Sequence, residues 1–168
     1  MRKESLAFLE ELVNTPSPTS YETRGQRVWL NYVQQYADET SHDDYGNCVA
    51  ILNKGGGQRI MLAGHADEIA LSVNYIDENG YIWVKRMGGV DAIVSKAQRV
   101  TIHSSKGGVL GIIGNPPPHM QKVDGEPKAP KITDLFIDIG CSSRTAAGKR
   151  VRIGDPITVN QNFEILHK

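Results

Sequence analysis

His65, Asp67 and Glu68 are the strongest candidates for chemistry in this 168-residue chain, because they directly follow an apolar run at residues 59–63. An apolar run that ends in glycine is typical of a buried central strand of an α/β sheet, and ligands bind at the carboxyl ends of such strands. In a His-x-Asp pattern the neutral imidazole can bind a zinc-like ion, while the carboxylate can fix the histidine tautomer or orient a neighbouring group. The pattern is also common by chance, and no second ligand lies within helical or hairpin reach. From spacing alone, a metal site and a chance pair both remain open.

Two helices are predicted before this run. Apolar residues at helical spacing indicate an opening helix that stops at Pro16 and Pro18. Thr19 and Glu22 have the spacing of a capping box, and apolar residues follow at helical intervals, so a second helix is predicted to begin at Thr19. Both helices are expected to pack on the sheet.

A turn and a hairpin connect the helices to the candidate site. Residues 43–47 have the composition of a turn, and residues 48–52 are predicted to form a strand. Three glycines at 55–57 lack the Gly-Lys-Ser/Thr that a phosphate-binding loop needs, so we expect a flexible hairpin loop there. That loop would return the chain into the strand at 59–63.

After Asp67 the pattern changes to strands alone. Asn79-Gly80 is a strong hairpin signal between two alternating segments, and residues 104–108 are a second hairpin candidate. Ser142 or Ser143 can cap a short helix. The predicted strands are residues 70–76, 81–86, 99–103, 109–113, 135–139 and 153–159.

The proline-rich segment 115–130 is too polar for a packed element and is predicted to be a mobile surface loop. His119 at its start could dip into an active site as part of a lid, or be an exposed histidine without a role. His103 is expected on a strand surface and is not a candidate ligand.

Composition excludes several function classes. The 19 acidic and 19 basic residues balance, which argues against nucleic acid as a partner. Glu10 and Glu11 interrupt the only apolar stretch near the start, so neither a signal peptide nor a membrane partner is expected. Cys48 and Cys141 lie far apart without metal-binding spacing, which favours free thiols in a reducing cytoplasm.

Six ordered segments carry a family resemblance, namely residues 14–22, 44–47, 64–69, 98–103, 108–114 and 135–140. Together they resemble the M42 family of metallo-aminopeptidases, which includes glutamyl aminopeptidases, deblocking aminopeptidases and proteins once labelled endoglucanases. Several ordered matches are far more specific than any single motif.

The resemblance implies a zinc-peptidase-like α/β catalytic domain with an inserted, mostly β dimerisation domain. Residues 1–70 would be the first part of the catalytic domain, residues 71–159 the insert, and residues 160–168 the return toward the catalytic domain. It further implies two divalent metal ions, zinc or cobalt, with His65 as a metal ligand and Asp67 as the catalytic-site carboxylate that orients it. Implied partners are peptide substrates and further copies of the chain, paired as dimers within a large assembly.

Family members are about twice this long, as two domains of ordinary size would be. The bridging aspartate, the catalytic glutamate and the remaining ligands that the family uses have no counterpart here, and His103, His119 and His167 do not cluster with carboxylates. We therefore expect an incomplete active site. The chain is either the amino-terminal piece of a longer aminopeptidase or a short homologue that acts as an oligomerisation module. A glycosidase is disfavoured, because paired carboxylates across a sugar-sized cleft cannot be placed.

Overall fold

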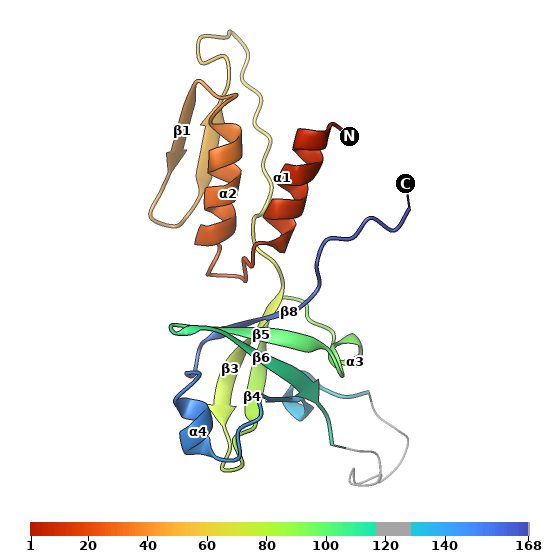
Figure 1. The fold of residues 1–168 in the computed structure, drawn as a ribbon. Coiled ribbons are helices and arrows are strands. Elements are labelled where there is room, and N and C mark those ends of the chain that lie inside the picture. The colour runs from red at the N-terminus through yellow and green to blue at the C-terminus, as the bar shows by residue number, and fades with distance from the viewer. Residues whose placement is uncertain (117–128, 168) are drawn as a thin grey trace. The chain divides into compact units, whose positions relative to one another are not determined.

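The computed structural model describes residues 1–116 and 129–167, which form two compact units. One unit comprises Met1–Glu68 together with the segment that starts at Gln161. The other comprises Ile69–Asn160. The chain is thus a mixed α/β protein, as the sequence predicts (Figure 1).

In the first unit, helices α1 (Lys3–Asn14) and α2 (Thr23–Val33) lie side by side (Figure 1). The rings of Phe8 and Tyr32 stack between them, with centroids 3.8 Å apart. The predicted start of α2 at Thr19 is wrong. The carboxylate of Glu22 accepts the backbone N–H of Ser20 at 2.6 Å, and the Thr19 side chain bonds elsewhere, so no capping box forms.

A two-stranded hairpin follows, made of β1 (Glu39–His42) and β2 (Cys48–Ile51). Its turn is closed by Asp43, whose two carboxylate oxygens accept the backbone and side-chain N–H groups of Asn47, both at 2.8 Å. The predicted turn at 43–47 is therefore confirmed, but the strand that pairs with β2 precedes it in the chain.

The predicted central strand at 59–63 is wrong, and so is its hairpin with residues 48–52. The segment has no regular secondary structure, and Ile60, Met61 and Leu62 are 81%, 87% and 95% exposed. A central strand needs a hydrogen-bonded neighbour on each side. β2 pairs with β1 instead, and no other strand of residues 1–116 and 129–167 pairs with this run. An apolar sequence indicates the preference for burial but not the partner.

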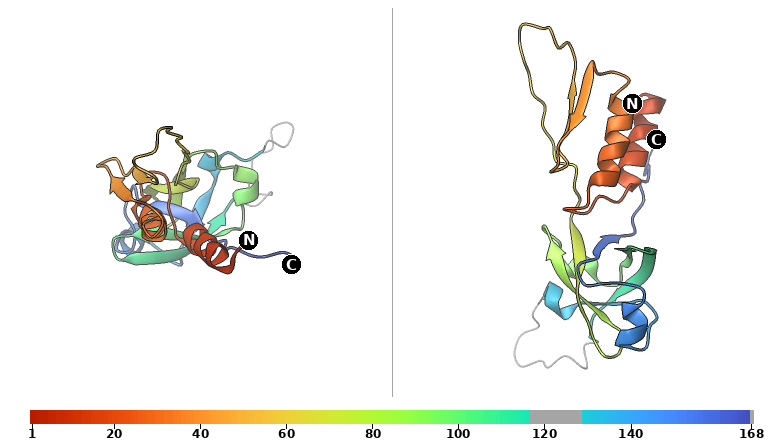
Figure 2. Two further views of the ribbon diagram at one scale, coloured as in Figure 1. Left: turned by 90° about the horizontal axis from the view of Figure 1, so that it is seen from above. Right: turned by 90° about the vertical axis from the view of Figure 1, so that its left-hand side faces the viewer.

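The second unit is a closed antiparallel barrel in which each strand pairs with two others, so no edge is left open (Figure 2). Short helical turns α3 (Ala92–Ser95), η2 (Ile132–Asp134) and α4 (Arg144–Gly148) connect its strands. Ser143 caps α4 through the backbone N–H of Ala146, as predicted. In spatial order the strands are β3 (Ala70–Ile76), β4 (Ile82–Met87), β7 (Phe136–Asp138), β6 (Gly107–Gly114), β5 (Arg99–Ser104) and β8 (Pro156–Val159).

The barrel core follows the period-two pattern of its strands. Alternate side chains point inward and are buried, as Val100 and Ile102 show on β5. At the β3–β4 hairpin, Gly80 has a φ of +90°, and an added Cβ would lie 2.7 Å from the carbonyl oxygen of Cys141. The Asn79-Gly80 hairpin is therefore confirmed, and only glycine fits its second position.

The proline-rich segment and the lengths of the helices also bear on the predictions. The predicted mobile loop at 115–130, with His119, falls mainly on residues 117–128, which lie outside the described residues. Across the part of the chain that is described, no helix has both the length and the apolar character needed to cross a bilayer.

Candidate functional site

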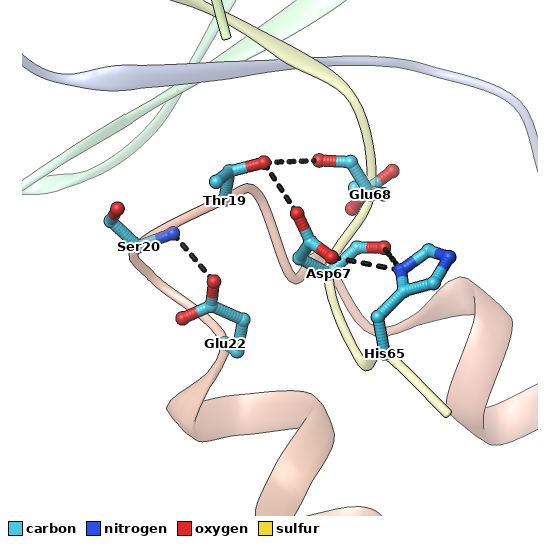
Figure 3. A network of polar contacts seen from close by, with 6 residues as sticks. All are labelled: Thr19, Ser20, Glu22, His65, Asp67 and Glu68. Carbon is cyan, nitrogen blue, oxygen red and sulfur yellow. Dashed lines mark hydrogen bonds and ion pairs between the residues drawn. The ribbon is translucent and has the colours of Figure 1, made fainter. Parts of the chain in front are cut away.

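His65 and Asp67 contact each other, which is one of the roles that the sequence allows for this carboxylate (Figure 3). The Nδ1 atom of His65 lies 2.8 Å from Oδ1 of Asp67 and 3.1 Å from the backbone carbonyl oxygen of the same residue. Both partners are hydrogen-bond acceptors, so Nδ1 must carry the hydrogen. The neutral imidazole then presents the lone pair of Nε2 outward, on a side chain that is 86% exposed.

The other carboxylate oxygen of Asp67 accepts a hydrogen bond from the Thr19 hydroxyl, with Oγ1 to Oδ2 at 2.7 Å. Each oxygen of Asp67 therefore has its own donor. These bonds, first from Thr19 and then from His65, hold the pKa of the Asp67 carboxyl below its usual value. Asp67 is ionised at neutral pH and acts as an acceptor that orients His65.

A short parallel pairing brings Thr19 and Asp67 together. The backbone N–H of Glu68 donates to the Ser17 carbonyl at 2.9 Å, and that of Thr19 donates to the Glu68 carbonyl at 3.3 Å. The Glu68 side chain also accepts the backbone N–H of Ser17 at 2.8 Å. Glu68 is thus used to hold the segment 17–19, and its carboxylate does not join that of Asp67.

Gly25 in α2 allows the segment 17–19 to pack closely. Ser17 is buried against this helix, and a Cβ added to Gly25 would lie only 2.2 Å from the Ser17 hydroxyl oxygen. A glycine inside a helix costs about 0.5–1 kcal/mol relative to alanine. Here it permits the contact that holds Ser17, and through the backbone pairing Thr19, in place.

The sequence did not identify Thr19 or Ser17 as residues of the site, or Glu68 as the residue that holds them. The one available signal was that residues 14–22 and 64–69 both match the same family, but nothing in the local sequence indicates that they pair. Glu10 and Glu11 are exposed on α1. His103 belongs to the barrel, where its Nε2 lies 2.9 Å from the Thr158 hydroxyl.

The residues present fit a metal ion in part. His65 offers an exposed nitrogen with its tautomer fixed, which is the arrangement typical of a metal-binding histidine. Among residues 1–116 and 129–167, however, no group of three or more His, Cys, Asp or Glu side chains gathers around one point. The described residues therefore supply one oriented ligand.

The fold and this pair define a mixed α/β protein with an oriented candidate ligand on one unit and a closed β-barrel as the other. The model of the M42 glutamyl aminopeptidase family matches residues 46–168. The chain belongs to this family.

Similar proteins agree with that assignment. Lysyl aminopeptidase of Pyrococcus furiosus is 33% identical over 143 residues, which cover 83% of this chain and 41% of the relative. A TET aminopeptidase from Thaumarchaeota archaeon SCGC AB-539-E09 superposes with a TM-score of 0.91 at 33% identity, covering 98% of this chain and 47% of that one. TET1 peptidase of Pyrococcus horikoshii, which can assemble into a tetrahedron or a large octahedral shell, superposes with a TM-score of 0.82 at 27% identity, covering 96% and 48%. The chain spans less than half the length of these proteins.

Proposed function

We propose that this chain is the amino-terminal part of a metal-dependent aminopeptidase that removes amino-terminal residues from peptides. In this proposal His65 binds one of two divalent ions, zinc or cobalt, and Asp67 orients it. The observation that carries the proposal is the hydrogen bond from His65 Nδ1 to Asp67 Oδ1 in a chain of the M42 family. The similarity to a lysyl aminopeptidase and to TET aminopeptidases supports peptides as the substrates.

Divalent ions bound in such a site polarise the scissile carbonyl and lower the pKa of water. The chain's own residues prepare a ligand for this task. Asp67 holds the proton on Nδ1, which leaves the lone pair on Nε2 of the neutral His65 side chain available to a metal ion. One histidine holds a divalent ion only weakly, so the 168-residue chain alone should bind metal weakly and hydrolyse no peptide.

The test is His65→Ala in a longer protein that contains this chain, assayed on aminoacyl-nitroanilides with metal content measured in parallel. Loss of a ligand should lower kcat/KM by more than about a hundredfold, since even partners of ligands are worth about 10–100-fold. His42→Ala, at an exposed histidine of β1, is the matched control and should change neither value. Full activity of the His65→Ala variant with unchanged metal content would refute the assignment.

We also propose that the barrel pairs two copies of the chain and that such dimers build a larger assembly. β6 turns Leu110 and Ile112 outward, where they are 70% and 51% exposed. Ile112 borders a shallow hollow with Phe136 of β7. Apolar surface on an otherwise complete barrel favours association, and the similar TET1 peptidase assembles into closed shells.

Sedimentation equilibrium at tens of micromolar tests this assembly, because an interface of standard size should be populated there. The chain should sediment as a dimer or larger, and Leu110→Ser combined with Ile112→Ser should shift it toward monomer. If the wild-type chain is a monomer, the pairing proposal is wrong and the barrel has only a structural role.

The cytoplasm is our proposed location, because Cys48 and Cys141 are both free thiols.

A further inference from the structure

We propose that Thr19 is a positioning residue for the metal site: its hydroxyl fixes the carboxylate of Asp67, and Asp67 in turn fixes the tautomer of His65. The inference rests on the proposed role of His65 as a ligand. It adds a residue from a segment 48 positions away in the sequence. The Thr19 hydroxyl contacts Asp67 and the Glu68 carbonyl and has no drawn contact with His65, so its effect on His65 must pass through Asp67 (Figure 3).

The carboxylate of an aspartate can rotate about its terminal bond. The terminal torsion of a carboxylate is broad and roughly two-fold, so one hydrogen bond does not fix the plane of the group. In Asp67 the two oxygens bond in different directions, Oδ1 to the His65 ring and Oδ2 to the Thr19 hydroxyl. The second bond removes the rotation that the first one leaves.

Thr19 has one hydroxyl hydrogen and two acceptors within reach. Oγ1 lies 2.7 Å from Oδ2 of Asp67 and 3.3 Å from the carbonyl oxygen of Glu68. The shorter bond goes to the charged acceptor, and bonds to carboxylates are the stronger kind. The hydroxyl therefore donates to Asp67, which already receives a hydrogen from His65 on its other oxygen.

The backbone of Thr19 is itself held. Its N–H donates to the Glu68 carbonyl, next to Asp67 in the chain, so donor and acceptor are carried on two paired segments. The branched Cβ of threonine restricts the rotation that brings the hydroxyl to Asp67. Serine would keep the donor with more rotational freedom, whereas valine would keep the shape and lose the donor.

The consequence for His65 concerns its two neutral tautomers. With Asp67 fixed, the hydrogen stays on Nδ1 and Nε2 keeps its lone pair. With the Asp67 carboxylate free to rotate, only the longer contact to the Asp67 backbone carbonyl still favours a hydrogen on Nδ1, so the imidazole shifts toward the Nε2–H form that isolated histidine prefers in water. That form has no lone pair on the outward nitrogen, so the fraction of ligand-competent histidine falls.

The test compares Thr19→Val, Thr19→Ser and wild type in the 168-residue chain, with nitrogen-15 in the histidine rings. Long-range proton–nitrogen correlation spectra at pH about 8.5, well above the usual histidine pKa of about 6.5, report the tautomer of His65 without any metal. Wild type and Thr19→Ser should be mainly Nδ1–H, and Thr19→Val should move clearly toward Nε2–H. Thr15→Val is the matched control, because it loses a hydroxyl bond of the same 2.7 Å length, to the Glu11 carbonyl, away from Asp67.

A second readout is a zinc titration followed by the same ring signals. Thr19→Val should weaken binding at His65 by about tenfold or more, and Thr19→Ser and Thr15→Val should stay within about twofold of wild type. If Thr19→Val does not fold, Thr19→Ala takes its place with the same expectation. An unchanged tautomer in the valine or alanine variant, or a wild type that is mainly Nε2–H, would overturn the proposal. A tautomer shift in Thr19→Val together with a fully active His65→Ala parent would uphold the role of Thr19 and refute the aminopeptidase site.

Discussion

The barrel and the unit that carries His65 differ in how much of their stability lies within the described chain. The buried hydrophobic side chains of the described residues, among them Val73, Ile102 and Ile137, all lie in the barrel. In the other unit the buried positions include Ser17, while Met61 and Leu62 are largely exposed. A closed sheet completes its hydrogen bonds and its core from its own strands. The helical unit instead has a two-stranded hairpin, the stacked rings of Phe8 and Tyr32 and a short backbone pairing of Pro18 with Glu68.

The largest expected effect is on the barrel core. Ile102→Ala should lower the free energy of unfolding of the barrel by about 2–5 kcal/mol, because it leaves a cavity among close-packed aliphatic side chains. Leu62→Ala, at a residue that is 95% exposed, should change stability by less than about 0.5 kcal/mol. Urea unfolding followed by tryptophan fluorescence measures both, because Trp83 lies in the barrel and Trp29 lies in α2 of the unit that carries Leu62. Equal losses in the two variants would contradict the contrast between the units.

A smaller loss is expected at the β3–β4 hairpin. Gly80→Ala should destabilise the barrel by about 1–3 kcal/mol, because φ is +90° and the new Cβ would crowd the Cys141 carbonyl oxygen. Gly57→Ala, where an added Cβ meets nothing within 4 Å, is the control in the other unit and should be nearly neutral. Thermal unfolding of the two variants measures both changes. An unchanged unfolding midpoint for Gly80→Ala would mean that the turn relaxes without strain.

Gly25→Ala should affect the site more than the stability. Alanine favours a helix by about 0.8–1 kcal/mol over glycine, yet its Cβ would displace the Ser17 hydroxyl. We expect a net change in unfolding free energy within about 1 kcal/mol, together with loosening of the backbone pairing between Ser17 and Glu68. Faster hydrogen exchange at the Glu68 amide measures that loosening. Unchanged exchange would mean that Ser17 moves without disturbing the pairing.

The smallest expected effect is the response of the β1–β2 turn to low pH. The Asn47 side chain, and then its backbone, lower the pKa of Asp43, so the folded turn favours the ionised carboxyl. Its contribution is present above the unfolded pKa and is lost as pH falls through the lower folded pKa. Below about pH 4 the amide signals of the β1–β2 turn should therefore shift before those of the barrel core, whose aliphatic side chains do not titrate. Asp43→Asn should remove this pH response, and a turn that responds identically in both proteins would exclude Asp43 as its source.

How much the sequence could predict depended on the distance between pairing partners. The hairpins of the barrel join neighbours in the chain, and β3 was predicted with the bounds that the structure has, Ala70–Ile76. The segment 59–63 has no such local partner, so its apolar pattern led to a wrong strand. β1 was missed for the opposite reason, because all of its residues are exposed and its sequence shows no alternation.

The candidate site shows the same limit. His65 and Asp67 are two residues apart, and that spacing allowed their contact without requiring it. Thr19 and Glu22 have the spacing of a capping box with each other, but the two side chains bond elsewhere. A hydroxyl can cap a helix or bond a distant carboxylate, and only the backbone pairing of residues 17–19 with Glu68 decides between them.

The pairing of β3 with β8 makes the barrel a separable module. These are its first and last strands, and Leu71 lies opposite Ile157 in an antiparallel register. The point where the chain enters the barrel is therefore next to the point where it leaves. A module with adjacent ends can be gained, lost or replaced by a short turn while the two flanking segments keep their spacing. A domain of this construction can vary between relatives faster than the site-bearing unit, and a chimaera that exchanges it needs only two junctions, near Ile69 and Asn160.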